Sequence, residues 1–236
     1  MGYGYYGWWD PTYILVVIGA VICMLASARV KGTFRKYSGC RSMSNLTGAQ
    51  TAERVLHAAG IYDVAIRHIS GSLTDHYDPR NKTLCLSDVV YGSASVAAVG
   101  VAAHECGHAI QHQKHYAPLA VRSAIVPVAN FGSTLAWPLI LIGLFLTGRT
   151  GALLMNFGIL CFSAAVLFQL VTLPVEFNAS RRAMRILGDT GILTSEELPK
   201  TGKVLRAAAF TYVAGAAASI LQLLRLLLLA GGRRDD

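Results

Sequence analysis

The chain has 236 residues, of which 53% are hydrophobic and only 14% are charged. A soluble domain carries about 25% charged residues, so this composition argues against an ordinary soluble protein and predicts a membrane protein. The formal net charge of +8 does not indicate nucleic-acid binding, because the basic residues flank apolar segments, as membrane-topology determinants do.

Residues 1–28 are predicted to form an N-terminal aromatic segment and a first membrane span. Residues 1–10 are rich in Gly and aromatic residues, which settle at membrane interfaces, and residues 11–28 carry no charge. A cleaved signal peptide is the alternative, but here the basic residues follow the apolar run instead of preceding it. These basic residues, at positions 29–41, are expected to hold the end of the span in the cytoplasm.

Residues 29–122 are expected to form a cytoplasmic region. Within it, Ala49–Ala59 has its apolar residues on one helical face, which predicts an amphipathic helix. Val64–Ile69 and Lys82–Ser87 alternate apolar and polar residues and therefore predict two strands. The segment between them ends in turn residues, so we expect a small antiparallel sheet that leads into a helix over residues 93–113.

That last helix contains an H-E-x-x-H motif formed by His104, Glu105 and His108. On a helix the two histidines lie one turn apart on the same face, so both imidazoles can bind one metal ion. Glu105 is rotated by about 100° from them and can reach a water at the metal instead. Two surface histidines are the alternative, but the flank from Val96 to Ala103 is wholly apolar. The motif therefore predicts a zinc site with a general base, and residues 29–122 are expected to be a cytoplasmic metallopeptidase region.

The second half of the chain contains two long uncharged runs, Ser123–Gly148 and Thr150–Val175, of 26 residues each. As helices they are long enough to cross a hydrocarbon core of about 30 Å. Residues 123–175 are therefore predicted to form a transmembrane helical hairpin with its tip outside the cytoplasm. Residues 176–206 are expected to form a basic cytoplasmic region, and residues 207–236 a fourth apolar span and tail.

Glu176 is the best candidate for a third metal ligand, since a catalytic zinc usually has three protein ligands and one open position. It is the only carboxylate between positions 106 and 188, and it directly follows an uncharged run. A carboxylate near a membrane is costly and usually marks a function or a partner charge. An interfacial ion pair with a following arginine is the alternative, and Asp189 is the reserve ligand.

Three motifs resemble the YugP-like membrane zinc metallopeptidases: HECGHAIQ at 104–111, DHYDPR at 75–80 and LPVEFNASRR at 173–182. The similarity covers nearly the whole chain. More distantly, the layout is similar to HtpX-like and prenyl-protein proteases, which are gluzincins with an E-x-x-x-D third-ligand motif. The resemblance implies a peptidase with Glu176 as a ligand. It also places Ser180 where those relatives have Asp, so that a hydroxyl would orient a histidine ligand.

We therefore predict a membrane-bound zinc-dependent endopeptidase that hydrolyses peptide bonds. Zn²⁺ held by His104, His108 and Glu176 would activate a water, and Glu105 would accept its proton and deliver it to the leaving amine. One donor side chain is expected to share the oxyanion with zinc. The candidates for this donor are Tyr212, His76 and Tyr77.

The predicted fold is mainly α: a membrane-embedded helical bundle of about four spans with a cytoplasmic zincin-like region and a small antiparallel β element. We expect a multi-pass protein of the cell membrane whose active site faces the cytoplasm. Its partners would be the lipid bilayer and a peptide or protein substrate, such as a membrane or misfolded protein.

Some alternatives stay open. One is an intramembrane site-2-type protease, and another is a catalytically silent zinc-binding scaffold, although a structural zinc site needs no base such as Glu105. The strand Lys82–Ser87 either binds an extended peptide by edge pairing or lies inside the sheet. The segment Asp75–Pro79 is either a structural turn or part of the rim of the active site.

Overall fold

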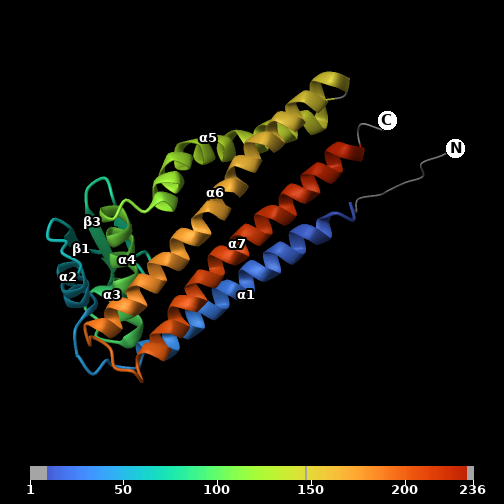
Figure 1. Cartoon of the computed structure of the whole chain (residues 1–236). Coiled ribbons are helices and arrows are strands. Elements are labelled where there is room, and N and C mark those ends of the chain that lie inside the picture. The colour runs from blue at the N-terminus through green and yellow to red at the C-terminus, as the bar shows by residue number, and fades with distance from the viewer. Residues whose placement is uncertain (1–9, 147, 233–236) are drawn as a thin grey trace. The chain divides into compact units, whose positions relative to one another are not determined.

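The computed structural model describes residues 10–146 and 148–232. The aromatic residues at positions 1–9, which are predicted to lie at the membrane interface, fall outside the described residues, as do Thr147 and residues 233–236. The described chain forms helices and one small sheet (Figure 1). The elements are α1 (Tyr13–Ser38), α2 (Gly48–Ala58), β1 (Ala65–Ile69), β2 (His76–Asp78), β3 (Thr83–Ser87), α3 (Asp88–Tyr91), α4 (Val96–Gln113), α5 (Ala117–Phe145), α6 (Gly148–Asp189) and α7 (Leu198–Gly232).

Four of these helices, α1, α5, α6 and α7, are long and apolar enough to cross a membrane. They confirm the predicted mainly α fold with four candidate membrane spans. The longest, α6, has 42 residues and therefore a length of roughly 63 Å at 1.5 Å per residue. A hydrocarbon core is only about 30 Å thick, so α6 must continue well beyond it.

The described chain divides into two compact units. The first unit contains the described residues up to 26, together with 121–171 and 212–232. Here α5 and the first part of α6 form a helical hairpin (Figure 1) that packs through small residues. A Cβ atom on Gly143 would lie 2.6 Å from the backbone nitrogen of Met155. Glycine thus permits a close backbone approach, as small residues do in other membrane helix pairs.

An ion pair explains the charge that interrupts the leucine-rich end of the chain. Arg225 of α7 donates to the carboxylate of Asp10, just before α1, over 3.1 Å. Its guanidinium carbon also lies 4.0 Å from the centre of the Tyr13 ring. The arginine is therefore paired within the first unit and does not face an apolar environment alone.

The second unit contains residues 27–120 and 172–211. Its core forms where α2, the sheet and α4 pack together, and side chains such as Val55, Leu84 and Val99 are fully buried there. The amphipathic helix predicted for residues 49–59 is observed as α2. It begins with a capping box, in which the Thr47 hydroxyl and the Gln50 side chain each accept a hydrogen bond from the other residue's backbone N–H.

The sheet is mixed, with strand order β1-β3-β2, and the prediction of a purely antiparallel sheet is wrong. The predicted strands are present as β1 and β3, but they pair in parallel, with Ala65 opposite Thr83. The difference arises because residues 76–78, predicted as part of a turn segment, form a third strand that pairs antiparallel with β3. As a result β3 is the central strand, which excludes the alternative in which residues 82–87 bind a peptide at a free edge.

Candidate metal centre

Three side chains in the second unit form a group that could hold a metal ion. The ligand atoms of His104, His108 and Glu176 all lie within 4.8 Å of one another. The Glu176 Oε2 is 3.2 Å from Nε2 of His104 and 3.6 Å from Nε2 of His108. The His104 ring is half-buried, whereas His108 and Glu176 are buried. This is the only such group of His, Cys, Asp and Glu within residues 10–146 and 148–232.

The two histidines come from α4, whose sequence favours a helix that begins at an N-cap. The Ser95 side chain accepts a hydrogen bond from the backbone N–H of Ala98 over 3.2 Å and so caps the helix. The helix then runs without a break to Gln113. His104 and His108 consequently project from adjacent turns, and their rings meet edge to face with centroids 4.9 Å apart.

Two glycines of α4 allow neighbouring helices to come close to the histidines. A Cβ atom on Gly107 would lie 2.6 Å from the carbonyl oxygen of Ala179 in α6, and one on Gly100 would lie 2.5 Å from the Cγ2 of Thr201 in α7. These glycines are seven residues apart and therefore lie on nearly the same face of α4, which is also the face of His104. Although glycine weakens a helix, here it lets the α6 backbone approach and brings Glu176 to the histidines.

Each histidine is oriented through its other ring nitrogen. Nδ1 of His104 is 3.0 Å from the Ser180 hydroxyl, and Nδ1 of His108 is 3.1 Å from the side-chain carbonyl oxygen of Gln111. When each Nδ1–H donates to these oxygens, the Nε2 atom of each neutral imidazole has its lone pair available for a metal. Ser180 thus contacts a histidine, as the resemblance implied, and does so with a hydroxyl where the related proteases have a carboxylate.

Gln111 is itself fixed by α6, because it is fully buried and both ends of its amide are used. Its Nε2 donates to the carbonyl oxygen of Val175 over 2.8 Å and to the Asn178 side chain over 3.0 Å. Asn178 also accepts a hydrogen bond from Nε of Arg182 over 2.7 Å. A chain of hydrogen bonds therefore runs from His108 to the polar side of α6 and holds the imidazole in one orientation.

Glu105 lies beside this group, but its carboxylate makes none of the contacts that join His104, His108 and Glu176. It is buried, and its carboxylate forms no hydrogen bond or ion pair with any residue in the described parts of the chain. The charge of Glu105 acts on His108: burial lowers the pKa of His108, but its hydrogen bond to the Glu176 carboxylate and the charges of Glu105 and Glu176 outweigh burial and raise that pKa above its usual value. Glu105 is therefore near the histidines without being tied to them.

The other predicted residues lie at different places. His76 in β2 is exposed, and its Nδ1 is 3.0 Å from the Thr74 carbonyl oxygen. Tyr77 lies next to it and points toward α4, where its hydroxyl is 2.9 Å from Nδ1 of His112. Burial and the charges of two nearby aspartates raise the pKa of Tyr77 to about 12. Tyr212 is an exposed residue of α7 that belongs to the first unit.

Two other residues with side chains that can bind metals, the reserve ligand Asp189 and the motif residue Cys106, do not join the group. Asp189 is exposed at the end of α6 and lies 3.9 Å from Nε of Arg185. Cys106 is fully buried on the other side of α4, where its thiol donates to the carbonyl oxygen of Ala52. Burial also raises the pKa of the Cys106 thiol well above its usual value, so it stays protonated and makes a poor metal ligand.

The three grouped residues fit a zinc ion. Two imidazoles and one carboxylate are ligands that zinc prefers, and ligands at 2.0–2.2 Å around a tetrahedral ion lie roughly 3.3 Å from one another. The distances of 3.2 and 3.6 Å from Glu176 to the two histidines are close to this spacing. Three protein ligands also leave a fourth position open, which is the arrangement of catalytic zinc sites.

Sequence reasoning missed the residues that support the group. Gln111 lies three residues after His108, so helical spacing alone places it next to that imidazole. A polar side chain at this spacing from a metal-ligand candidate was a signal that could have been used. Asn178 and Ala179 follow Glu176 in the same motif, but their contacts with α4 depend on which helices pack together. No local pattern in the sequence specifies that packing.

The chain is similar to known proteins over most of its length. A family model described as "Putative neutral zinc metallopeptidase" matches residues 12–231. The chain is 46% identical over 225 residues to the "Putative membrane protease YugP" of Bacillus subtilis (strain 168), an alignment that covers 95% of this chain and 99% of the relative. No solved structure matches the chain.

Proposed function

The chain belongs to the neutral zinc metallopeptidase family, and from this premise we propose that it is a membrane-bound zinc-dependent endopeptidase. The observation that carries the proposal is the convergence of two imidazoles and one carboxylate beside Glu105, which is buried and unpaired among the described residues. A site that only held a structural metal would need no such base. The substrate would be a peptide or a protein, such as a membrane or misfolded protein.

In this proposal His104, His108 and Glu176 hold zinc, with a carboxylate as third ligand in the manner of gluzincins. When bound, zinc supplies a Lewis acid that lowers the pKa of a water molecule to about 7 and polarises the scissile carbonyl. Ser180 and Gln111 keep the two imidazoles in the orientation that ligation requires.

Glu105 acts as the general base. Its carboxylate accepts a proton from the attacking water and then delivers that proton to the leaving amine. The absence of a hydrogen-bond partner for Glu105 among the described residues suits this role, because a carboxylate held by strong donors would be a weaker base.

Tyr77 is the oxyanion donor that the observed contacts favour among the three candidates. Its pKa of about 12 keeps the phenol protonated at neutral pH, so it can donate a hydrogen bond. It also contacts His112, which lies one turn beyond His108 on the motif helix. His76, by contrast, is exposed and contacts the Thr74 carbonyl.

The proposal is tested most simply by Glu105→Gln. Purified full-length protein in detergent should retain zinc and its fold, while hydrolysis of casein should fall by about 10²–10⁴-fold, because an amide cannot accept the proton. Zinc content and casein turnover are measured on the same preparations. Wild-type turnover in the folded, zinc-loaded variant would remove Glu105 as the base and would count against this mechanism.

We further propose that the active site faces the cytoplasm. The support is the charge pattern, with five basic residues at positions 29–41 and six at 181–206, against one at 147–151. An impermeant maleimide added to intact cells should label Thr150→Cys and spare Ala58→Cys, in a background from which the five native cysteines have been removed. Labelling of position 58 with protection of position 150 would reverse the orientation.

A further inference from the structure

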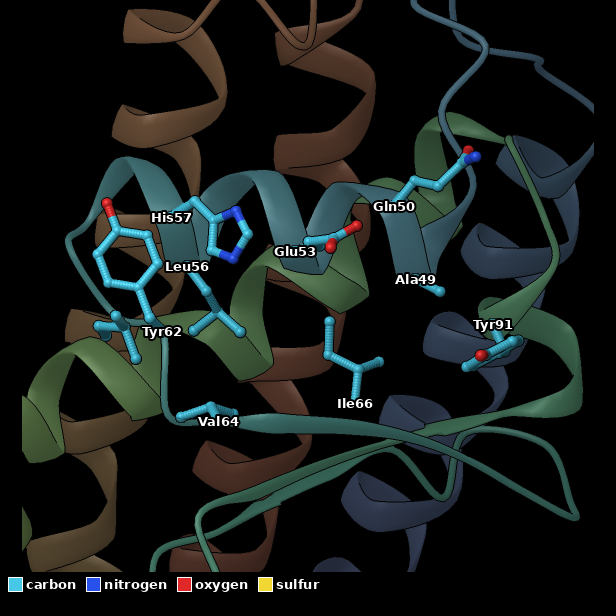
Figure 2. A pocket seen from close by; sticks show the side chains of 10 residues that line it. Ala49, Gln50, Glu53, Leu56, His57, Tyr62, Val64, Ile66 and Tyr91 are labelled. Atoms are coloured by element: carbon cyan, nitrogen blue, oxygen red, sulfur yellow. The ribbon is translucent and has the colours of Figure 1, made fainter.

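A second site lies between α2 and β1, in the unit that also contains His104, His108 and Glu176, which we call the metal group. It is a groove with a volume of about 490 Å³ (Figure 2), within the range of ligand-binding clefts. No member of the metal group lines it. We call it the α2–β1 groove, and its lining residues are Ala49, Gln50, Glu53, Leu56, His57, Ile61, Tyr62, Val64, Ile66 and Tyr91.

The groove has an apolar floor and a polar rim. Leu56 from α2 and Ile66 from β1 point into it from opposite sides, as Figure 2 shows. Tyr62 stands at one end, where its ring stacks at 5.0 Å on His57 while 76% of the residue stays exposed. Tyr91 lies at the other end. The groove therefore offers an occupant apolar contacts between α2 and β1 and polar side chains around them.

The backbone of β1 is open along this groove. Among the described residues, β1 is an edge strand that pairs with β3 alone. Its ladder begins with the N–H of Ala65 donating to the carbonyl oxygen of Lys82 over 2.9 Å. Because successive residues of a strand direct their N–H and C=O groups to alternate sides, those of Ile66 and His68 face the open edge. Such an edge is a template for pairing with another extended chain.

The rim carries one uncompensated charge. Glu53 is the only Asp, Glu, Lys or Arg among the lining residues, it is exposed, and it has no ion-pair partner in the part of the chain that the structure describes. In Figure 2 its carboxylate lies on the α2 side of the groove, between Gln50 and His57. A basic side chain of an occupant would complement this carboxylate, whereas an acidic one would be repelled.

We propose that the α2–β1 groove binds an extended segment of the protein substrate by strand addition to β1, with apolar side chains on the floor and a basic side chain facing Glu53. This inference rests on the proposed endopeptidase function, because it takes the occupant from the substrate. It assigns a binding site away from the metal group, one that would hold part of a long polypeptide while another part is cut.

The test uses full-length Glu105→Gln protein in detergent, so that binding is measured without turnover. The probe is the fluorescein-labelled peptide Thr-Val-Thr-Lys-Thr-Val-Thr, in which the two Val and the Lys side chains share one face of a strand. A second probe has Glu in place of Lys. The Lys peptide should bind at least about tenfold more tightly than the Glu peptide, since like charges at one contact are strongly disfavoured.

Glu53→Lys should reverse this preference, while Glu196→Lys, the same charge change at an exposed residue outside the groove, should leave it unaltered. Two further Lys peptides carry an N-methyl group on every second residue. One is methylated at its odd-numbered residues and the other at its even-numbered residues. Strand addition predicts that one of these two loses binding and the other keeps it. This arm changes only the peptide, so it does not depend on the folding of a variant.

Equal binding of the Lys and Glu peptides, or binding that survives both methylations, would overturn the proposal. On wild-type protein the unlabelled Lys peptide should also raise the KM for casein without lowering kcat, and an unchanged KM would rule out the substrate as the occupant. Casein hydrolysis without any peptide binding would reject the groove alone. Peptide binding to protein that never hydrolyses casein would instead reject the proposed protease function.

Discussion

The two units of the protein differ in the side chains that they expose and in whether they bury polar ones. In the first unit, large apolar residues such as Phe145 and Leu160 are exposed, and the helices pack through glycine. In the second unit, apolar side chains fill the core, and polar residues are buried among them. Every buried polar or charged residue of the described chain belongs to this second unit: Ser42, Thr51, Thr83, Ser87, Ser95, Glu105, His108, Gln111, Thr172, Glu176, Glu197 and Thr201.

This difference indicates that the surface of the first unit suits a lipid environment and that of the second unit suits water. Exposed apolar helices are stable only against lipid, where association depends on close packing of small residues. Buried polar groups are stable only when they are hydrogen-bonded or functional, and the metal group accounts for several of those in the second unit. Helices α1, α6 and α7 contribute residues to both units, so Glu176 lies on the same helix as a membrane hairpin.

Replacing one tightly packed glycine in each unit should distinguish helix packing in the first unit from zinc binding in the second. This replacement has the largest expected effect. Gly107→Leu forces a side chain into the Ala179 carbonyl, which a Cβ atom would already approach to 2.6 Å. We expect it to push α6 away from α4 and to abolish both zinc binding and hydrolysis. The measurements are zinc content and casein turnover of the folded fraction.

Gly143→Leu is the matched control in the first unit, where a Cβ atom would lie 2.6 Å from Met155 N. It should lower thermal stability in detergent, yet the folded fraction should keep its zinc. If both variants lost zinc equally while folded, the proposed difference between the first unit, which packs helices, and the second unit, which binds zinc, would be contradicted.

A smaller effect is expected from Gln111→Met, which preserves volume but removes the hydrogen bonds to His108 and Val175. Residues that orient metal ligands typically contribute 10–100-fold to metal affinity, so zinc binding should weaken by roughly that factor while the fold persists. Competition with a zinc-specific chelator measures it.

Cys106→Ala is the control for Gln111→Met, because Cys106 is equally buried on α4 but faces Ala52. Its zinc affinity should equal that of the wild type. An affinity loss in Cys106→Ala as large as that in Gln111→Met would mean that general loosening of α4, and not the lost hydrogen bond, is the cause.

The three residues that the structure brings together were named from the sequence because their signals are local or unusual. The H-E-x-x-H spacing places both histidines on one helical face, and Glu176 was identified because it is an isolated carboxylate beside an uncharged run. The four apolar helices followed from length and composition, which are also local properties.

The parts that were not predicted depend on contacts between distant segments. Alternation of apolar and polar residues marks a strand but does not name its partner, so the parallel pairing of β1 with β3 was missed. From the sequence alone, Gly107 only indicates a less stable point in a helix. Its role in close helix packing is seen only in the structure, where it lies against Ala179. The hydrogen bond from Gln111 to Val175 joins residues 64 positions apart.

The central claim is that Glu176 of α6 completes a zinc site with the histidines of α4. The most direct test is the zinc content of purified full-length protein, measured by mass spectrometry for wild type, Glu176→Ala and Asp189→Ala. We predict about one zinc ion per chain in the wild type and in Asp189→Ala, and zinc loss together with loss of hydrolysis in Glu176→Ala. Full zinc in folded Glu176→Ala, or its loss in Asp189→Ala, would contradict the account.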